Sequence, residues 1–137
     1  MTRRSRAREV VLQVLYQDDL NPQADRQRAA DFLRDRLQNN KPLVEFAQKL
    51  LDGVLRNRQE VDSLLARFAD NWSLERMAAT DRNVLRLGAY EILYADTPDR
   101  VAINEAVELA KRYGSRQSAQ FVNGILDRLL KERQEPT

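Results

Sequence analysis

Residues 42–54, PLVEFAQKLLDGV, carry the clearest structural pattern in this chain. The apolar residues recur at the spacing of one helix face, namely Leu43, Phe46, Ala47, Leu50, Leu51 and Val54. Pro42 suits the first turn of such a helix, where its missing N–H leaves no intrahelical hydrogen bond unmade. The stretch therefore predicts an amphipathic helix with one buried face.

The same helical period continues on both sides of this stretch. Two apolar sets precede it, Ala7, Val10, Val11, Val14 and Leu15, then Ala29, Phe32, Leu33 and Leu37. Four follow it: Val61, Leu64, Leu65, Phe68 and Trp72; Val84, Leu85, Gly88 and Ile92; Ile103, Ala106, Val107 and Ala110; and Val122, Ile125, Leu126 and Leu129. No segment alternates with period two, and no long repeat appears. We therefore predict a compact all-α domain of six or seven helices, with corners at Pro22, Pro42 and Pro98.

Composition argues for binding rather than catalysis. The chain has 137 residues and 15.9 kDa, the size of one domain, here residues 1–137. It contains neither Cys nor His, which removes thiolate and imidazole metal ligands and every Ser-His or Cys-His nucleophile pair. The paired acids Asp18-Asp19 and Glu105-x-x-Glu108 are typical of solvated helix faces. We predict no enzyme activity, no cofactor and no metal site.

Positive charge is concentrated at the N-terminus. The net charge is +2, from 23 basic and 21 acidic residues, and 19 of the basic residues are Arg. Residues 1–8 contain Arg3, Arg4, Arg6 and Arg8 with no acid, so they form a basic N-terminal arm on a nearly neutral body. Cations at a helix start oppose the helix dipole, which suggests a use in binding phosphates. The alternative is a flexible basic tail without a role. At the other end of the chain, the last helix is expected to fray into a polar tail at residues 132–137.

Hydropathy points to the cytoplasm. The longest apolar runs are far shorter than the roughly 20 residues that span a bilayer. The basic N-terminus is not followed by the apolar segment of a secretory signal. We therefore predict a cytoplasmic protein without a membrane partner.

Two aromatic residues and three glycines are candidates for special positions. Tyr16 fits the edge of a core or a base-stacking position, and Phe121 lies about 100° from the centre of its helix stripe. For Phe121 packing and stacking remain equally open. Gly88 and Gly124 predict close helix crossings, and Gly114 predicts a left-handed residue at a helix end.

Several blocks go beyond general patterns. They are RARE (6–9) leading to QVLY (13–16), Arg76-Met77, DRNVLR (81–86), Tyr90-Glu91, VAINEAVELAK (101–111) and FVNGIL (121–126). In this order they resemble the NusB family of bacterial transcription antitermination factors. The resemblance covers about residues 3–130, although residues 20–60 match only in pattern.

The resemblance implies an all-α fold of two small packed helical bundles and a non-catalytic role. Family members bind the boxA element of nascent ribosomal RNA with the ribosomal protein NusE, in the RNA polymerase antitermination complex. Carried over to this chain, the RNA-binding residues would be Arg3, Arg4, Arg6, Arg8, Gln13, Tyr16, Arg116, Gln120, Phe121 and Asn123. The NusE-binding residues would be Asp81, Val84, Leu85, Tyr94 and Glu105.

Two alternatives accompany this interpretation, and some properties remain open within it. A related helical domain precedes the catalytic domain of ribosomal RNA cytosine methyltransferases, for which a chain ending at Thr137 would be a truncation. A helical interaction protein would show no RNA selectivity. The family includes both monomers and homodimers. Within the site, Asn104 and Glu105 could instead cap a helix start, and position 117 is Gln where some members carry an acid.

Overall fold

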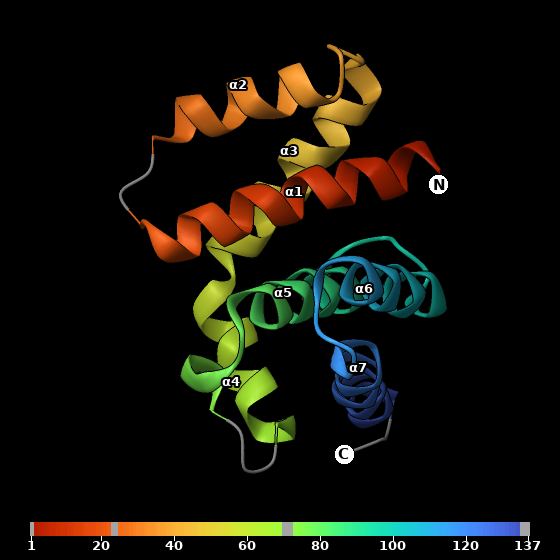
Figure 1. Ribbon diagram of the computed structural model, residues 1–137. Helices are drawn as coiled ribbons and strands as arrows, with labels where there is room; N and C mark the ends of the chain where they lie inside the picture. Colours follow the sequence, from red (N-terminus) through yellow and green to blue (C-terminus); the bar gives the residue numbers. More distant parts are fainter. Residues whose placement is uncertain (1, 23–24, 70–72, 135–137) are drawn as a thin grey trace. The chain divides into compact units, whose positions relative to one another are not determined.

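The computed structural model describes residues 2–22, 25–69 and 73–134. These residues form seven α-helices and a 3₁₀ turn: α1 (Arg3–Leu20), α2 (Arg26–Arg36), α3 (Lys41–Arg56), α4 (Arg58–Phe68), η1 (Leu74–Arg76), α5 (Ala79–Tyr94), α6 (Asp99–Tyr113) and α7 (Ser118–Gln134) (Figure 1). No strand occurs among them. The predicted all-α class and helix number are therefore confirmed. Trp72 and the tail residues 135–137 lie outside the described residues.

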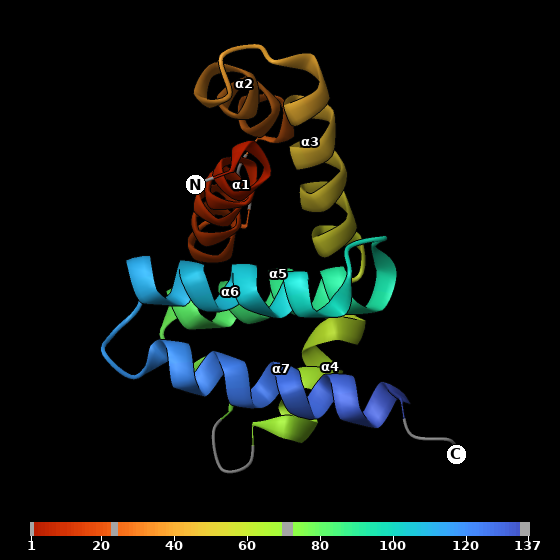
Figure 2. The same ribbon diagram turned by 90° about the vertical axis from the view of Figure 1, so that its right-hand side faces the viewer.

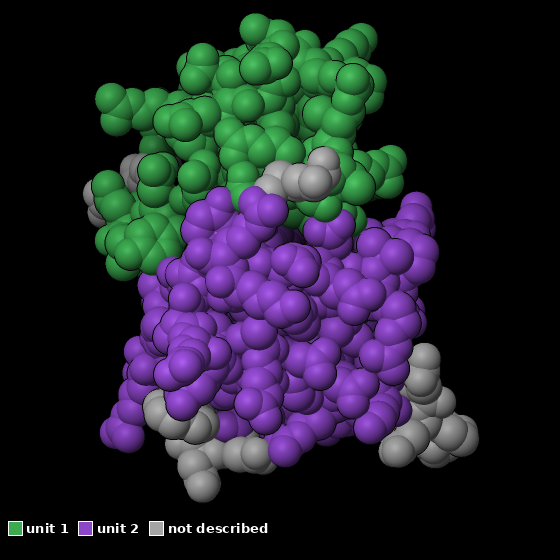
Figure 3. Space-filling view, turned by 45° about the vertical axis from the view of Figure 1, so that its right-hand side comes forward, with its two compact units in different colours: residues 1–56 green, residues 57–137 purple. Residues whose placement is uncertain are grey.

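The chain divides into two compact units at the boundary between α3 and α4. One unit comprises residues 1–56 and the other residues 57–137 (Figure 3). Asn57 lies between the two helices and is the N-cap residue of α4. Its side chain makes no capping hydrogen bond. This division agrees with the two small bundles that the family resemblance implies.

In the first unit α1 packs against α3, and α2 contacts both (Figure 1). The buried stripe of α1 includes Val10 and Val11, and that of α3 includes Leu50 and Leu51. Each helix start has a side-chain cap that satisfies an otherwise unpaired N–H. The Thr2 hydroxyl accepts from the Ser5 N–H at 3.0 Å. Asp25 and Asn40 cap α2 and α3 in the same way.

In the second unit α5, α6 and α7 pack against one another, and α4 contacts α5 and α7 (Figure 2). Gly88 on α5 allows α6 and α7 to approach α5 closely. A Cβ there would lie 2.7 Å from Leu126 Cδ1 and 3.1 Å from Ala106 Cβ. The predicted close crossing at Gly88 is thus confirmed.

A buried ion pair joins α4 to α5. Arg86 is buried and donates two hydrogen bonds to the Asp62 carboxylate, at 2.8 and 2.9 Å. Its third donor reaches Asn83 Oδ1 at 3.1 Å, and Asn83 in turn donates to the Ala79 carbonyl. This network fixes the register of α5 on α4, because the planar guanidinium fork matches the carboxylate in one orientation.

The structure corrects two predictions about glycines. Gly114 ends α6 with a φ of −92°, so it is not left-handed. It is needed for space, since a Cβ would lie 2.4 Å from Ser118 Oγ. Gly124 makes no close crossing, because nothing lies within 4 Å of the position of its Cβ.

Candidate nucleic-acid interface

The arginines predicted to bind RNA occupy the first two turns of α1. The helix begins at Arg3, so residues 3–8 are helical, and the first turn contains no acid. Arg3 and Arg4 are exposed, and Arg6 is half-buried. The helix places positive charge at its own positive end, which is unfavourable for stability and favourable for an anion. The N-terminal turns therefore present a cationic surface.

Two of these arginines share one aromatic support. The guanidinium carbons of Arg4 and Arg8 lie 4.7 and 5.1 Å from the centre of the Phe46 ring on α3. Arg4 is exposed, whereas Arg8 is only 3% exposed. Stacking on the ring occupies the guanidinium face and leaves its N–H edge able to donate. The apolar stripe of residues 42–54 includes Phe46, but no sequence pattern shows that its ring also contacts two arginines.

Arg6 is held by its own helix. It pairs with Glu9, three residues further along, and Glu9 is 5% exposed. A buried carboxylate needs such a partner, since an uncompensated charge there would be costly. Arg6 therefore has both a structural contact and an outward position.

Gln13 and Tyr16 continue the same helix. Gln13 is half-buried, and its Oε1 has no hydrogen-bond donor within the described part of the chain. A buried acceptor without a donor costs about 1–3 kcal/mol. The Tyr16 side chain is 40% exposed, which leaves part of its ring accessible.

The second predicted RNA surface lies at the start of α7. Arg116, Gln120 and Asn123 are exposed, and Phe121 is half-buried. The next residue, Val122, is completely buried, so the core stripe begins beside Phe121 and not on it. The Ser118 hydroxyl accepts from the Ser115 N–H at 2.8 Å and closes the turn before the helix.

Only part of the predicted NusE surface is accessible. Val84 and Leu85 are 0% exposed, so their assignment to a partner surface is corrected: apolar side chains at these α5 positions are core residues. Asp81 and Glu105 are half-buried, and Tyr94 is 41% exposed. The Oδ1 atom of Asp81 is buried and has no donor among the described residues. The capping alternative for Glu105 is wrong, since α6 begins at Asp99.

Tyr94 ends α5 beside Tyr90 and Glu60. The two tyrosine ring centres are 5.6 Å apart. Burial, followed by the hydrogen bond and the negative charge of Glu60, raises the pKa of the Tyr94 hydroxyl above its ordinary value of 10.0. The hydroxyl therefore donates its one proton to Glu60 and keeps it to a higher pH than a free tyrosine does.

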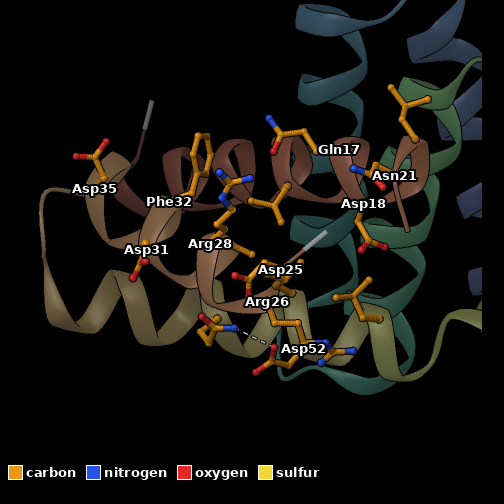
Figure 4. Close-up of a pocket in the computed structure, with 16 residues that line it drawn as sticks. Gln17, Asp18, Asn21, Asp25, Arg26, Arg28, Asp31, Phe32, Asp35 and Asp52 are labelled. Carbon is orange, nitrogen blue, oxygen red and sulfur yellow. Dashed lines mark hydrogen bonds between the residues drawn. The ribbon is translucent and has the colours of Figure 1, made fainter. Parts of the chain in front are cut away.

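An acidic groove of about 740 Å³ opens among α1, α2 and α3 (Figure 4). Its lining contains two arginines, Arg26 and Arg28, and five aspartates, Asp18, Asp25, Asp31, Asp35 and Asp52. None of the residues predicted to bind RNA lines it. Because the lining carries more negative than positive charge, this groove disfavours a polyanion, in contrast to the first turns of α1.

The described residues also lack two other kinds of site. No three acidic side chains among them are grouped as metal ligands would be. No helix within the described ranges is long and apolar enough to cross a membrane.

This chain is similar to known proteins of one family. The profile described as "NusB family" matches residues 5–131. The transcription antitermination protein NusB of Thermodesulfovibrio yellowstonii is 40% identical over 140 aligned positions, covering 95% of this chain and 93% of that protein.

Solved structures agree with the sequence match. T. maritima NusB superposes with a TM-score of 0.85 at 40% identity, over 96% of this chain and 92% of that chain. A crystal structure of the antitermination factors NusB and NusE in complex with double-stranded RNA matches with a TM-score of 0.81 at 28% identity, over 96% and 98% of the two chains. Since both the profile and these relatives span nearly the whole sequence, the chain belongs to the NusB family.

Proposed function

We propose that this chain is a transcription antitermination factor that binds the boxA element of nascent ribosomal RNA together with the ribosomal protein NusE. As part of the RNA polymerase antitermination complex it supports transcription of ribosomal RNA operons. Family membership and the NusB relative in complex with NusE and RNA support this proposal. The observation that carries it is the set of arginines at the start of α1, where charge is unfavourable for the helix itself.

Each unit has its own set of proposed RNA-binding residues. On α1, Arg3, Arg4 and Arg6 contact phosphates, Gln13 and Tyr16 contact exposed bases, and Arg8 supports the surface through Phe46. At the start of α7, Phe121 stacks on a base and Arg116 donates hydrogen bonds. The side-chain amides of Gln120 and Asn123 donate and accept them. Single-stranded RNA suits this combination of cations, aromatic rings and amides.

The proposed NusE surface uses Asp81, Tyr94 and Glu105. Tyr94 offers a partly exposed ring, while its hydroxyl is hydrogen-bonded to Glu60. Asp81, half-buried in the first turn of α5, contributes a negative charge to this surface. The chain acts by binding and not as an enzyme, and it works in the cytoplasm, where nascent ribosomal RNA is made.

Fluorescence anisotropy with a boxA-like RNA tests this function. A scrambled RNA of the same length and composition is the control, and each RNA is measured with and without NusE. We expect selective binding to the boxA-like RNA that tightens when NusE is added.

Equal, weak and salt-sensitive binding to both RNAs would contradict the proposal. That result would favour a helical interaction protein with a basic N-terminus. Methyl transfer to ribosomal RNA by a longer form of the chain would instead support the methyltransferase alternative.

A further inference from the structure

A second, basic pocket of about 440 Å³ lies beside the first turns of α1. It is formed within the first unit by the start of α1, the end of α2 and the connection to α3. Its lining residues are Arg3, Arg6, Arg36, Leu37, Gln38, Asn40 and Leu43. Three are arginines and, among the described residues that line it, none is acidic. The pocket thus brings together cations from helices separated by some thirty positions of sequence.

The nearby acids neutralise little of this charge on the α2 side. Arg36 approaches Asp35 at 3.9 Å, and the Asp35 side chain is 84% exposed. Exposed pairs at this distance contribute little and are screened by salt. On the α1 side, Arg6 pairs with Glu9. Since Arg3 and Arg36 remain in addition to the Arg6–Glu9 pair, the pocket keeps a net positive charge.

Arg36 is positioned to donate hydrogen bonds in the plane of its guanidinium group. Its guanidinium carbon lies 4.9 Å from the centre of the Phe32 ring on the same helix. The ring supports one face of the guanidinium, while the N–H groups at its edge remain geometrically able to meet an oxyanion. This is the same arrangement that Phe46 gives Arg4.

The connection from α2 to α3 is held in an uncommon conformation beside these cations. Gln38 and Asn39 have φ values of 55° and 56°, in the left-handed region that non-glycine residues seldom adopt. Backbone hydrogen bonds from Asn39 to Arg34 and from Asn40 to Leu37 hold the turn at 2.8 and 3.0 Å. The turn places Gln38 and Asn40 in the pocket wall, where both amides can donate.

We propose that this pocket binds a backbone phosphate of the RNA, so that the interface extends from α1 onto Arg36, Gln38 and Asn40. The inference rests on the proposed RNA-binding function and adds a contact to it. Arg3 and Arg6 hold the phosphate from one side and Arg36 from the other. The amides of Gln38 and Asn40 donate to its oxygens.

Salt dependence of RNA binding tests the contact. For single strands, each phosphate contact contributes about 0.7 to the slope of log affinity against log salt concentration. We expect Arg36→Gln to reduce the slope by about 0.7 and to weaken binding of a boxA-like RNA several-fold in low salt. Arg36→Lys, which keeps the charge, should retain most of the slope.

Arg34→Gln is the matched control. Arg34 lies two residues away on the same exposed helix, pairs with Asp31 and does not line the pocket. Arg34→Gln removes the same charge as Arg36→Gln. Equal effects of the two substitutions on RNA binding would show that only the overall positive charge of the helix matters, and would overturn the proposal. Circular dichroism and thermal melting confirm that each variant is folded.

Neutral RNA linkages identify the phosphate itself. A series of boxA-like RNAs, each with one methylphosphonate linkage, should contain one that weakens binding to the original chain but not to Arg36→Gln. If the original chain prefers boxA and no linkage behaves in this way, the pocket is refuted while the function stands. If the original chain shows no RNA preference, the proposed function fails and the pocket inference with it.

Discussion

Gly124 and Gly88 occupy helix interiors for different reasons, although the sequence makes them look alike. Gly88 lies where α5 meets buried Leu126, while Gly124 is exposed and has open space around it. We expect Gly124→Ala to raise the free energy of unfolding by about 1 kcal/mol through helix propensity. Gly88→Ala should lower it by about 1 kcal/mol, since overpacking outweighs the same gain.

Urea unfolding of the two variants measures both changes. Equal shifts in the same direction would contradict the difference in packing. RNA affinity of Gly124→Ala is a useful second measurement, because Gly124 follows Asn123 in the proposed interface. A stabilised variant that binds RNA less well would show that the missing Cβ serves the ligand.

Tyr94 should make stability depend on alkaline pH. Its pKa is raised in the folded chain, so between the unfolded value near 10 and the higher folded value the folded form keeps a proton that the unfolded form has lost. The contribution is fully present below pH 10 and decreases as the pH rises through the folded pKa. Thermal melting from pH 8 to 11 should show a shallower decline for Tyr94→Phe. Identical profiles for the two proteins would refute this assignment.

At the scale of elements, the first turn of α1 combines an unfavourable charge with a proposed function. Arg3 is exposed, and the turn contains no acid that would offset the helix dipole. Arg3→Gln should therefore weaken RNA binding while leaving the melting temperature unchanged or slightly higher. Arg8→Gln is the contrasting variant, since its buried side chain packs on Phe46 and its loss should lower the melting temperature. A destabilised Arg3→Gln would contradict this separation.

Removing one partner of the ion pair between α4 and α5 should be costly for stability. Asp62→Ala leaves the Arg86 guanidinium, 6% exposed, without its carboxylate. Loss of a partner from a buried pair costs about 3–5 kcal/mol, and the partial exposure of Asp62 lowers this to about 2–3 kcal/mol. Replacing Asp62 with Ala and Arg86 with Met together should recover part of the loss. Chemical denaturation of the single and double variants tests this; a loss below 0.5 kcal/mol would contradict it.

Across the whole molecule, the sequence predicted the helices better than their contacts. The stripe containing Leu50 and Leu51 is local information, because helical period and burial follow from neighbouring residues. The Arg86–Asp62 pair joins positions 24 residues apart, and no local pattern marks which carboxylate an arginine meets. Gly114 shows a further limit, since left-handed backbone and close approach both require the same residue.

The candidate site was predictable to a similar degree. The arginines of α1 could be identified because residues 1–8 contain four cations and no acid. The position of Phe121 away from the apolar stripe agrees with its half-buried side chain. Val84 and Leu85 were misplaced because resemblance transfers motif positions without their burial. Arg36 was missed, since its relation to Arg3 exists only after α2 has folded back beside α1.

The two ends of α1 carry opposite charges, and this affects how many nucleotides of RNA the protein covers. Arg3 and Asp18 are 15 residues apart, which is about 22 Å along a helix, well beyond the screening length of about 8 Å in physiological salt. The two ends therefore act independently, one attracting a polyanion and the other repelling it. We expect the footprint on RNA to be bounded at the aspartate end, so that lengthening an oligomer in that direction adds no affinity.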